Sequence, residues 1–469
     1  MMPSVLIIGA GISGLSLAYR LGQQAPNASI TVLESAPRIG GKVWTERRDG
    51  FLVESGANGF LDLKPSSLEL CHDLGIANQL ISGSEAAQTN RYLFRGHGLE
   101  RLPNSLLSFL LSPVMSWRGK LSLLAERLRP RRRECTDESV AAFAHRRLGR
   151  EAADNLADAF VSGIHAADPA LLSLPAAFPR LALLEREYGS ILRGMSALSR
   201  QRRQSARAQG QTSPPPQRLW SFPDGLRTWI ESLAAHLKQP PRVGVEVQNL
   251  IRPTSTNSVW TAMDSGGEKW TADAVVLACP AADQARLLRP MDVELAERIG
   301  SIAYAPVLVV AMGFRTADVP QPLDGFGYLT PQKLKRDVLG VQWCSSIFPG
   351  RAGEGQVLMR AMCGGWGRQD IAGWDDDRLT EAVRAELRAS LGIVAPPHFR
   401  EIIRWPRALP QYHLGHLDRV SWIEARSGDH QGLFLGGNAY GGVSLNDCTE
   451  RAVILAVQIA PFLRSRKGT

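Results

Sequence analysis

The segment VLIIGAGISGLSLAYRL, residues 5–21, restricts the fold most, because it joins an apolar strand, a glycine-rich turn and a helix. A continuous apolar run such as VLII is typical of a parallel strand that is buried on both faces. Gly9 permits the tight turn, Gly11 lets a pyrophosphate approach the backbone, and Gly14 lets the helix pack on the strand. The helix N-terminus then faces the anion. This arrangement predicts a Rossmann-like α/β domain.

An acidic residue stands where such a domain requires a ribose-binding group. The segment ITVLE, residues 30–34, is typical of a second strand and ends at Glu34, 20 residues after Gly14. A carboxylate at that point accepts hydrogen bonds from ribose hydroxyls. A glycine-rich turn that serves packing alone is the alternative, and the combined context disfavours it. The sequence therefore predicts dinucleotide binding.

The end of the chain repeats this order of elements. Residues 433–456, LFLGGNAYGGVSLNDCTERAVILA, run from apolar residues through a cluster of glycines into a helical pattern. Two such units in one chain either hold different parts of one ligand or are unrelated turns.

Strand and helix patterns are mixed between these two ends. Residues 376–392 predict an amphipathic helix, with Leu379, Val383, Leu387 and Leu391 on one face and Gly392 at its end. Helical spacing also covers 137–160, and 105–117 with a break near Pro113. Residues 205–218, which contain three consecutive prolines, predict a mobile loop or linker. Short β-branched runs predict strands at 242–252, 258–263, 272–280, 306–314 and 356–365.

Length and composition narrow the function classes. A chain of 469 residues suggests two or three domains. Its six cysteines lack Cys-x-x-Cys spacing, which disfavours a disulfide framework or a zinc site and fits a reducing compartment. The uncharged N-terminus lacks the basic region of a signal peptide, and no segment has the roughly 20 apolar residues of a membrane span. We therefore expect a cytoplasmic protein without a transmembrane helix.

Positive charge is concentrated in two segments. The net charge is +9, and 127–133 and 200–207 are rich in arginine without any acid. Nucleic-acid binding is disfavoured, because no recognisable binding module accompanies this charge. The first segment follows the apolar residues 106–117, a combination that predicts a membrane-surface patch on the inner face of the cell membrane. A solvated basic loop is an equal alternative for 200–207.

Further motifs identify a family. Arg38, Gly40 and Gly41 resemble the Arg-x-Gly-Gly signature of the FAD-containing amine oxidase superfamily. Lys42 occupies the position where that superfamily usually has an arginine after the glycines. Over nearly the whole chain the sequence resembles the flavin-dependent protoporphyrinogen/coproporphyrinogen oxidases. The resemblance is carried by blocks that include NRYLFRGHGLERLP (90–103), FVSGIHAADPALLSLPAAFPRL (160–181), GFGYLTP (325–331), LGVQWCSSIFPGRA (339–352), RALPQYHLGHLDRV (407–420) and GNAYGGVSLNDC (437–448).

This resemblance implies a fold that is α/β plus α+β. An FAD-binding Rossmann-like domain would be formed by 1–85, 216–285 and 421–469. Residues 86–215 would form a helical, membrane-associating domain and part of the substrate domain, and 286–420 would form the mixed-sheet substrate domain. The last strand would return to the FAD-binding domain, and its following helix would bury Ala452, Leu455, Ala456 and Ile459 and point its N-terminus at the flavin.

The resemblance also implies cofactor contacts. The ADP part of FAD would be held by the first glycine turn, by Glu34 with Ser35, by Lys42, and by Val247 through its backbone. The loop 56–59 and residues 443–445 would flank the flavin ring, with Trp405 beside it; a packing role is the alternative for Trp405. The complete predicted set is Gly9, Ala10, Gly11, Ile12, Ser13, Gly14, Glu34, Ser35, Lys42, Gly56, Ala57, Asn58, Gly59, Val247, Trp405, Val443, Ser444 and Leu445.

Four substrate contacts follow from the same comparison. Arg91 would bind a propionate, because its planar fork matches a carboxylate; a surface arginine at a strand end is the alternative. Leu329, Gln342 and Met362 would form walls around the tetrapyrrole, with the last two departing from the Leu and Phe of some members. The Gly163 backbone would lie close to the reacting carbons.

The implied reaction is the six-electron oxidation of a porphyrinogen to a porphyrin in haem biosynthesis, with oxygen as acceptor and hydrogen peroxide as by-product. Such flavin chemistry needs no catalytic dyad, and we assign no catalytic side chain. His165 is interpreted as structural, and His413 and His416 lack a third metal ligand nearby, so no metal is expected.

Two other functions compete with this one. The first is a different flavin enzyme of the same fold, an amine oxidase or a desaturase. The second is an inactive porphyrin-binding scaffold that keeps FAD for structure. The resemblance also raises a homodimer and neighbouring haem-pathway enzymes as partners, without deciding either or the choice between protoporphyrinogen and coproporphyrinogen.

Overall fold

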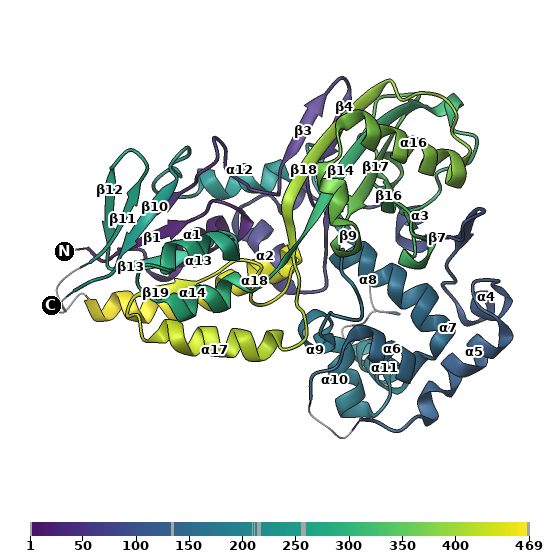
Figure 1. Ribbon diagram of the computed structural model, residues 1–469, viewed down its shortest axis with the longest axis horizontal. Helices are drawn as coiled ribbons and strands as arrows, with labels where there is room; N and C mark the ends of the chain where they lie inside the picture. Colours follow the sequence, from purple (N-terminus) through teal and green to yellow (C-terminus); the bar gives the residue numbers. More distant parts are fainter. Residues whose placement is uncertain are drawn as a thin grey trace.

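A four-stranded parallel sheet contains both ends of the chain. The computed structural model describes residues 2–132, 136–208, 210, 212, 217–254 and 259–466. The strand order is β19-β13-β1-β2, and Ile7 of β1 pairs with Val32 of β2 and Val276 of β13. Val276 also pairs with Phe434 of β19, so the C-terminal strand lies in the same sheet as the N-terminal one (Figure 1). The strands are β1 (Ser4–Ile8), β2 (Ser29–Leu33), β13 (Ala274–Leu277) and β19 (Leu433–Leu435).

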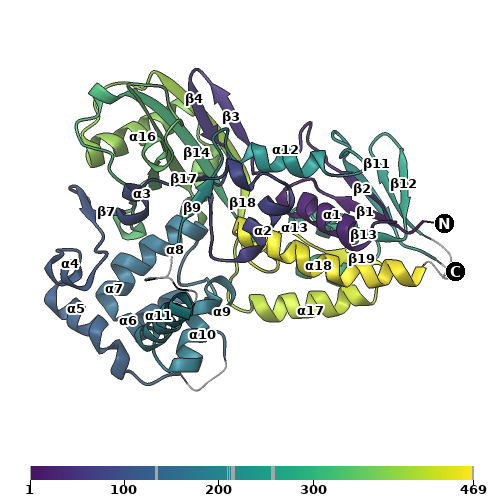
Figure 2. The same cartoon turned by 180° about the vertical axis from the view of Figure 1, so that it is seen from behind.

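Both faces of this sheet are covered, as its continuous apolar strands require. Val5 and Ile7 pack against one group of helices, which Figure 2 shows in front of the sheet: α1 (Ile12–Gln24), α2 (Pro65–Asp73), α12 (Arg227–Ala235) and α18 (Leu445–Ser465). Leu6 and Ile8 pack on the other side against an antiparallel meander and three helices: β10 (Val247–Ile251), β11 (Trp260–Asp264), β12 (Lys269–Ala272), α13 (Ala281–Leu288), α14 (Val293–Gly300) and α17 (His416–Gly428).

A second, larger sheet is mixed and has seven strands in the order β18-β14-β17-β16-β15-β7-β8. Only the pairing of β15 with β7 is parallel among its described pairs. The helix α16 (Asp376–Leu391) covers one face with Leu379, Val383 and Leu387, which confirms the helix predicted at 376–392. The strands are β7 (Tyr92–Phe94), β8 (Leu99–Arg101), β14 (Tyr304–Arg315), β15 (Gly327–Leu329), β16 (Val338–Trp343), β17 (Gln356–Gly364) and β18 (Phe399–Pro410).

Short elements connect the two sheets. The hairpin of β3 (Thr45–Arg48) and β4 (Phe51–Glu54) places Phe51 against Phe399 of β18, with ring centroids 4.6 Å apart. A small antiparallel sheet lies nearby in the order β5-β9-β6. These elements are β5 (Phe60–Leu61), β6 (Ile81–Ser82), α3 (Glu85–Thr89), β9 (Leu219–Ser221) and α15 (Cys344–Ile347).

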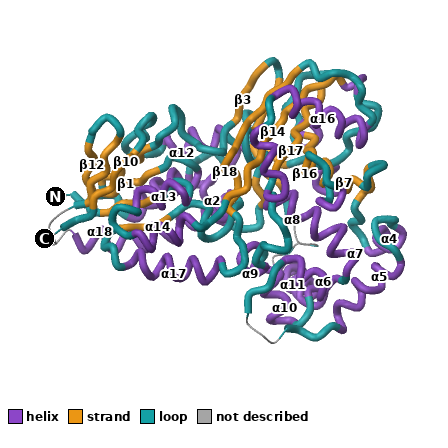
Figure 3. Tube along the Cα trace, viewed as in Figure 1, coloured by secondary structure: helices purple, strands orange, loops and turns teal. Residues whose placement is uncertain are grey.

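Helices alone form the region at the lower right of Figure 3. The break predicted near Pro113 separates α4 (Leu106–Leu111) from α5 (Trp117–Leu124). The helical spacing predicted at 137–160 is confirmed, but it is divided between several helices: Gly149, at φ +88°, ends the first of them, and a π-helical turn at Ala153–Ala157 follows. The other helices are α6 (Val140–Leu148), α7 (Arg150–Ala152), α8 (Asp158–His165), α9 (Leu174–Ala177), α10 (Pro179–Tyr188) and α11 (Ile191–Ala208).

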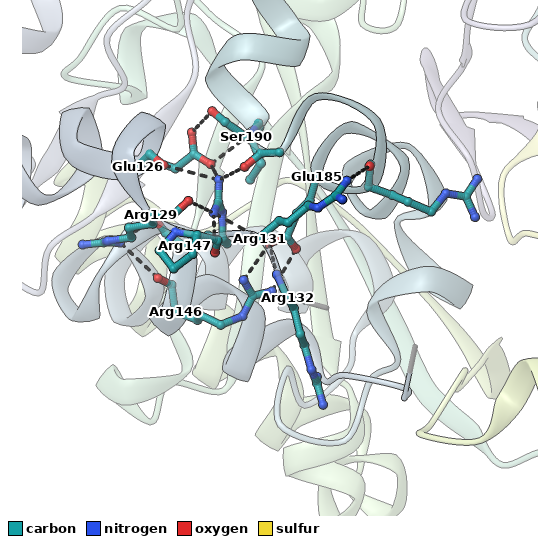
Figure 4. Close-up of polar contacts among 12 residues, drawn as sticks. Glu126, Arg129, Arg131, Arg132, Arg146, Arg147, Glu185 and Ser190 are labelled. Atoms are coloured by element: carbon teal, nitrogen blue, oxygen red, sulfur yellow. Dashed lines mark hydrogen bonds and ion pairs between the residues drawn. The ribbon is translucent and has the colours of Figure 1, made fainter. Parts of the chain in front are cut away.

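A buried ion network holds this helical region together (Figure 4). Arg147 and Glu126 are both fully buried and form an ion pair. Glu126 also accepts from the Ser190 hydroxyl at 2.6 Å, and Arg147 donates to the Arg129 carbonyl at 2.9 Å. Arg129 itself donates to the hydroxyl of Ser122 at 2.6 Å. The basic run 127–133 therefore does not lie wholly on the surface, because Arg129 is directed into the helical region.

Two further expectations are corrected. Residues 205–208 belong to α11 rather than to a linker, since the helix anchored by buried Ile191 and Gly194 continues through them. Residues 213–216 of the predicted linker lie outside the described residues. Residues 242–246 precede β10, and the Arg242 amide donates to the Val32 carbonyl at 2.8 Å instead of extending the strand.

Candidate cofactor and active site

A cavity of ≈ 1270 Å³ extends from the glycine turn after β1 to the seven-stranded sheet and α8. Its volume exceeds the ~300–1,000 Å³ of ordinary small-molecule pockets, so it has room for a large cofactor beside a substrate. Most of the residues predicted from the sequence lie on its wall, namely Gly9, Gly11, Ile12, Ser13, Glu34, Ser35, Lys42, Gly56, Ala57, Asn58, Gly59, Gly163, Val247, Gln342, Met362, Trp405, Val443, Ser444 and Leu445. Ala10, Gly14, Arg91 and Leu329 do not line it.

The glycine turn leaves space for an anion at the start of α1. A Cβ on Gly11 would meet no protein atom within 4 Å, whereas one on Gly14 would lie 1.9 Å from the Gly9 carbonyl oxygen. Gly14 is therefore required for packing, and Gly11 borders open space in the cavity. Because Gly11 is the N-cap and provides no capping side chain, the first amides of α1 are free to bind a phosphate.

Glu34 faces the same end of the cavity. Its Oε2 accepts from the Ala10 amide at 2.8 Å and its Oε1 accepts from the Ala36 amide at 2.9 Å. These bonds fix the carboxylate, which keeps further lone pairs for ribose hydroxyls. Val247 is buried at the start of β10 and lines the cavity beside them. The donors and acceptors thus fit the adenosine part of a dinucleotide.

Lys42 is a poorly solvated cation of the cavity wall. Its Nζ donates to the Ala408 carbonyl at 2.6 Å and lies 5.5 Å from the centre of the Tyr304 ring. Burial lowers the pKa of Lys42 to about 8. The nearby Arg38 instead donates to the carbonyls of Ile39 and Gly41. A bound anion would stabilise the charged form of Lys42 and raise its pKa.

The middle of the cavity has features that suit a flat ring. The Trp405 Nε1 donates to the Ser55 carbonyl at 2.7 Å, which fixes the indole beside the loop 56–59. Asn58 is only 6% exposed, and neither polar atom of its side chain has a hydrogen-bond partner among the described residues. On the other side, Ser444 and Asp447 form a capping box at the start of α18. The unpartnered amide of Asn58 and the fixed indole of Trp405 together suit a flat ring with polar atoms at its edge.

The outer end of the cavity lies between α8 and the seven-stranded sheet. Gly163 lines the cavity, and a Cβ on it would lie 2.3 Å from Cδ2 of Leu329. Leu329 therefore stands behind Gly163 rather than on the wall itself. Arg91 is exposed, and its guanidinium lies 5.4 Å from the ring centre of Phe326, which does line the cavity. Arg91 thus lies near the mouth, next to a wall residue.

Sequence reasoning missed several wall residues, of which Arg360 carries the most chemistry. Arg360 is on β17, is 2% exposed, and donates from Nη2 to the Gly56 carbonyl at 2.5 Å. It lies two positions before Met362, and residues so spaced in a strand share a face. That alternation would have placed Arg360 on the wall once Met362 was assigned. Val307, Val309, Phe326 and Cys448 also line the cavity and were not predicted.

The histidines lie outside the cavity wall. His165 is 5% exposed and packs edge-on against Phe178, with ring centroids 5.0 Å apart. His416 is 1% exposed and stacks on Tyr412 at 4.1 Å. Among the residues that the structure describes, no group of His, Cys, Asp and Glu side chains is arranged to hold a metal ion. His165 therefore has a packing role in this structure.

Acid is expected to destabilise the fold through these histidines. Burial lowers the pKa of His165 and of His416 to about 4, below the roughly 6.5 of an unfolded histidine. Below pH ~6.5 the unfolded chain binds protons that the folded chain does not, so stability is lost as pH falls towards 4. The drop in melting temperature between pH 7 and pH 5 should therefore be smaller for His416→Phe than for the wild type. The control is His97→Gln, because His97 is exposed. A drop in melting temperature for His416→Phe as large as that of the wild type and of His97→Gln would contradict this prediction.

Comparison with known proteins places the chain in a class and then in a family. Residues 12–460 match the model for flavin containing amine oxidoreductases. The chain is 32% identical to the chloroplastic protoporphyrinogen oxidase of Nicotiana tabacum, over 98% of this chain and 85% of that protein. It is 27% identical to the coproporphyrinogen III oxidase of Bacillus subtilis, over 95% of this chain and 96% of that protein. A crystal structure described as a putative protoporphyrinogen oxidase from Exiguobacterium superposes with a TM-score of 0.82, 25% identity and coverage of 98% and 99% of the two chains.

The fold and cavity therefore define a flavoprotein oxidoreductase. The chain belongs to the flavin containing amine oxidoreductase family, and its cofactor is FAD. The predicted fold class is confirmed. The individual residue assignments and the domain boundaries stay predictions, which the positions described above support.

Proposed function

We propose that this enzyme oxidises a porphyrinogen, protoporphyrinogen IX or coproporphyrinogen III, to the corresponding porphyrin in haem biosynthesis. The observation that carries the proposal is one continuous cavity that joins a dinucleotide-binding turn to an apolar wall formed by Val307, Val309 and Met362. That wall suits a flat tetrapyrrole more than a small charged amine. The names of the relatives from Nicotiana tabacum and Bacillus subtilis support the same substrate class.

The residues of the chain would bind and orient the substrate rather than exchange protons with it. Bound FAD would supply the redox chemistry, namely hydride acceptance from a methylene bridge and reoxidation by oxygen with release of hydrogen peroxide. The absence of a side chain at Gly163 lets α8 pack directly on Leu329, which supports from behind the helix backbone that lines the cavity. Apolar Val307, Val309 and Met362 exclude water from the reacting face.

A second flavin chemistry, amine oxidation, has less support. Amine oxidases use a pair of aromatic side chains as a cage beside the flavin, and Tyr440 is the candidate partner for Trp405. Tyr440 is instead buried beneath the first sheet, where its hydroxyl donates to Gln284 Oε1 at 2.6 Å. Tyr440 therefore does not form an aromatic cage with Trp405.

Incubation with both porphyrinogens and a panel of amines tests the proposal. We expect porphyrin fluorescence to rise with at least one porphyrinogen and hydrogen peroxide to form with it. Peroxide formed only from an amine would identify an amine oxidase. Tight porphyrin binding without any turnover would identify an inactive scaffold.

We further propose that the helical region binds a membrane surface from the cytoplasmic side. Six apolar side chains of 106–128 are 42–82% exposed there: Leu107, Leu111, Trp117, Leu121, Leu124 and Leu128. Arg118, Arg127 and Arg131 are exposed beside them. An apolar face with a basic margin suits the interface of an anionic bilayer. Among the described residues, no helix is long and apolar enough to cross a membrane.

Flotation with anionic vesicles tests this binding. The wild type is expected to float at low salt, and Leu111→Asp with Leu121→Asp is expected to stay in the dense fraction. Val394→Asp is the matched control, because Val394 is 66% exposed but follows α16 on the distant sheet. Wild-type protein that does not float at low salt would refute the proposal.

A further inference from the structure

Arg360 lies in the wall of the cavity without a carboxylate partner. Three arginines of the described residues have almost no exposure, and two of them are paired: Arg147 with Glu126, and Arg351 with Glu54 at 3.5 Å. Within the described part of the chain, Arg360 has no ion pair, and its Nε and Nη1 have no hydrogen-bond partner. A buried, unpaired charge is costly, so its presence indicates an anion that the protein alone does not provide.

A second unpartnered polar group lies beside this guanidinium. Gln342 on β16 is the Cα partner of Arg360 on β17, so both side chains point to the cavity face of the sheet. The Gln342 Oε1 is buried and has no hydrogen-bond partner among the described residues. An arginine and an amide that both lack partners form a small polar site within an otherwise apolar wall.

The strand register relates this polar site to Arg91 at the cavity mouth. Arg91 stacks over Phe326, and the next residue, Gly327, is the Cα partner of Gln342. Gln342 is in turn paired with Arg360. Neighbouring strands are ~4.8 Å apart, so about 10 Å of sheet separates Gly327 from Arg360. Gly327, Gln342 and Arg360 thus form a row of paired residues across the sheet. Arg91 lies near the exposed end of this row, and Arg360 is its buried end.

The two porphyrinogens differ in what they would present to the buried end. Coproporphyrinogen III carries a propionate on every pyrrole, so opposite edges of the macrocycle are both acidic. Protoporphyrinogen IX carries its propionates along one edge and vinyl groups along the other. A carboxylate matches the fork of an arginine, whereas a vinyl edge would leave the guanidinium unpaired.

We propose that Arg360, assisted by Gln342, forms an inner carboxylate subsite that selects coproporphyrinogen over protoporphyrinogen. This inference rests on the proposed porphyrinogen oxidation and on the outer propionate binding by Arg91. Arg360 acts as a specificity-determining residue: the substrate edge near Arg91 is common to both porphyrinogens, and the edge near Arg360 distinguishes them.

Steady-state kinetics of the FAD-loaded enzyme with each porphyrinogen test this subsite. Arg360→Met should lower kcat/KM for coproporphyrinogen by about 30-fold, mainly through KM, and leave protoporphyrinogen unchanged or improved. Arg360→Lys keeps the charge without the fork and should give a smaller loss. Arg404→Gln is the matched control, because Arg404 is on β18 of the same sheet but pairs with exposed Asp376. Equal losses for both porphyrinogens in Arg360→Met would overturn the inference.

Two further measurements separate this inference from other roles. Fluorescence titration with coproporphyrin and protoporphyrin measures binding without turnover. If the wild type oxidised neither porphyrinogen, the proposed function would be refuted, but the titration would still test the subsite. Arg360→Met should then weaken coproporphyrin selectively, and equal affinities in wild type and variant would overturn the inference. A shifted flavin reduction potential with unchanged porphyrin discrimination would show instead that Arg360 acts on the cofactor.

Discussion

Replacing Gly14 by alanine is expected to prevent both stable folding and FAD binding. The new Cβ would lie 1.9 Å from the Gly9 carbonyl oxygen and 3.1 Å from its carbon, and these are backbone atoms that no rotamer change can move. Because Gly9 also donates to the Leu33 carbonyl at 2.7 Å, the turn cannot shift without breaking its contact with β2. We expect a loss of about 4 kcal/mol or more in the free energy of unfolding. Denaturant titration and the flavin absorbance of the purified protein measure both effects.

Gly11→Ala and Gly22→Ala separate cofactor binding from folding. Gly11 has φ −72°, which alanine adopts, and its Cβ would enter open space, so the FAD-free protein should keep its stability within about 0.5 kcal/mol. FAD affinity should nevertheless fall at least about 100-fold, because the methyl group occupies the path of the pyrophosphate. Gly22 lies in the same helix with only Ile30 Cδ1 at 3.9 Å, so Gly22→Ala should gain about 0.5–1 kcal/mol and bind FAD normally. Normal FAD binding by Gly11→Ala would contradict the assignment of this turn.

The parts of the fold that follow from local patterns were predictable from the sequence. The strand, turn and helix around Gly9–Gly14 are specified by residues that are close along the chain, as is the stop of α16 at Gly392. The helix α18 begins at Leu445, directly after Ser444, and Ala452, Leu455, Ala456 and Ile459 are among its buried residues as expected. Resemblance to a family then added assignments that local patterns do not contain.

The remaining features depend on long-range packing, which no local pattern reveals. The unpaired state of Arg360 follows from the distances to carboxylates on other strands, and only the register of β16 with β17 puts Gln342 beside it. The break at Gly149 depends on a contact with Ser122, whose hydroxyl lies 2.1 Å from where a Cβ would stand. Arg129 counted as surface charge in the sequence, but its place beside Arg146 and Arg147 depends on how the helices pack.

Breaking the Arg147–Glu126 pair is expected to cost about 3–5 kcal/mol of unfolding free energy, because Glu126 alone is an uncompensated buried charge and Arg147 alone keeps only the longer contact with Glu185, at 3.7 Å. Glu126 has a second role, since it accepts from the amides of Ile191 and Leu192 at 2.9 and 3.1 Å and so caps α11. Burial alone would raise the pKa of Glu126, but the hydrogen bonds from Ser190 and these amides hold it below its usual value. The carboxylate is therefore charged at neutral pH and needs the guanidinium of Arg147.

Denaturant titration of Arg147→Met, Glu126→Gln and the double variant tests this network. Each single variant should lose several kcal/mol, and the double variant should lose less than the two losses added together, because removing both charges leaves neither unpaired. Arg47→Met is the control, since Arg47 and Asp224 form an exposed pair whose loss should stay within about 0.5 kcal/mol. Losses that add fully in the double variant would show that Arg147 and Glu126 stabilise the helical region independently, through their separate contacts with the Arg129 carbonyl and the start of α11.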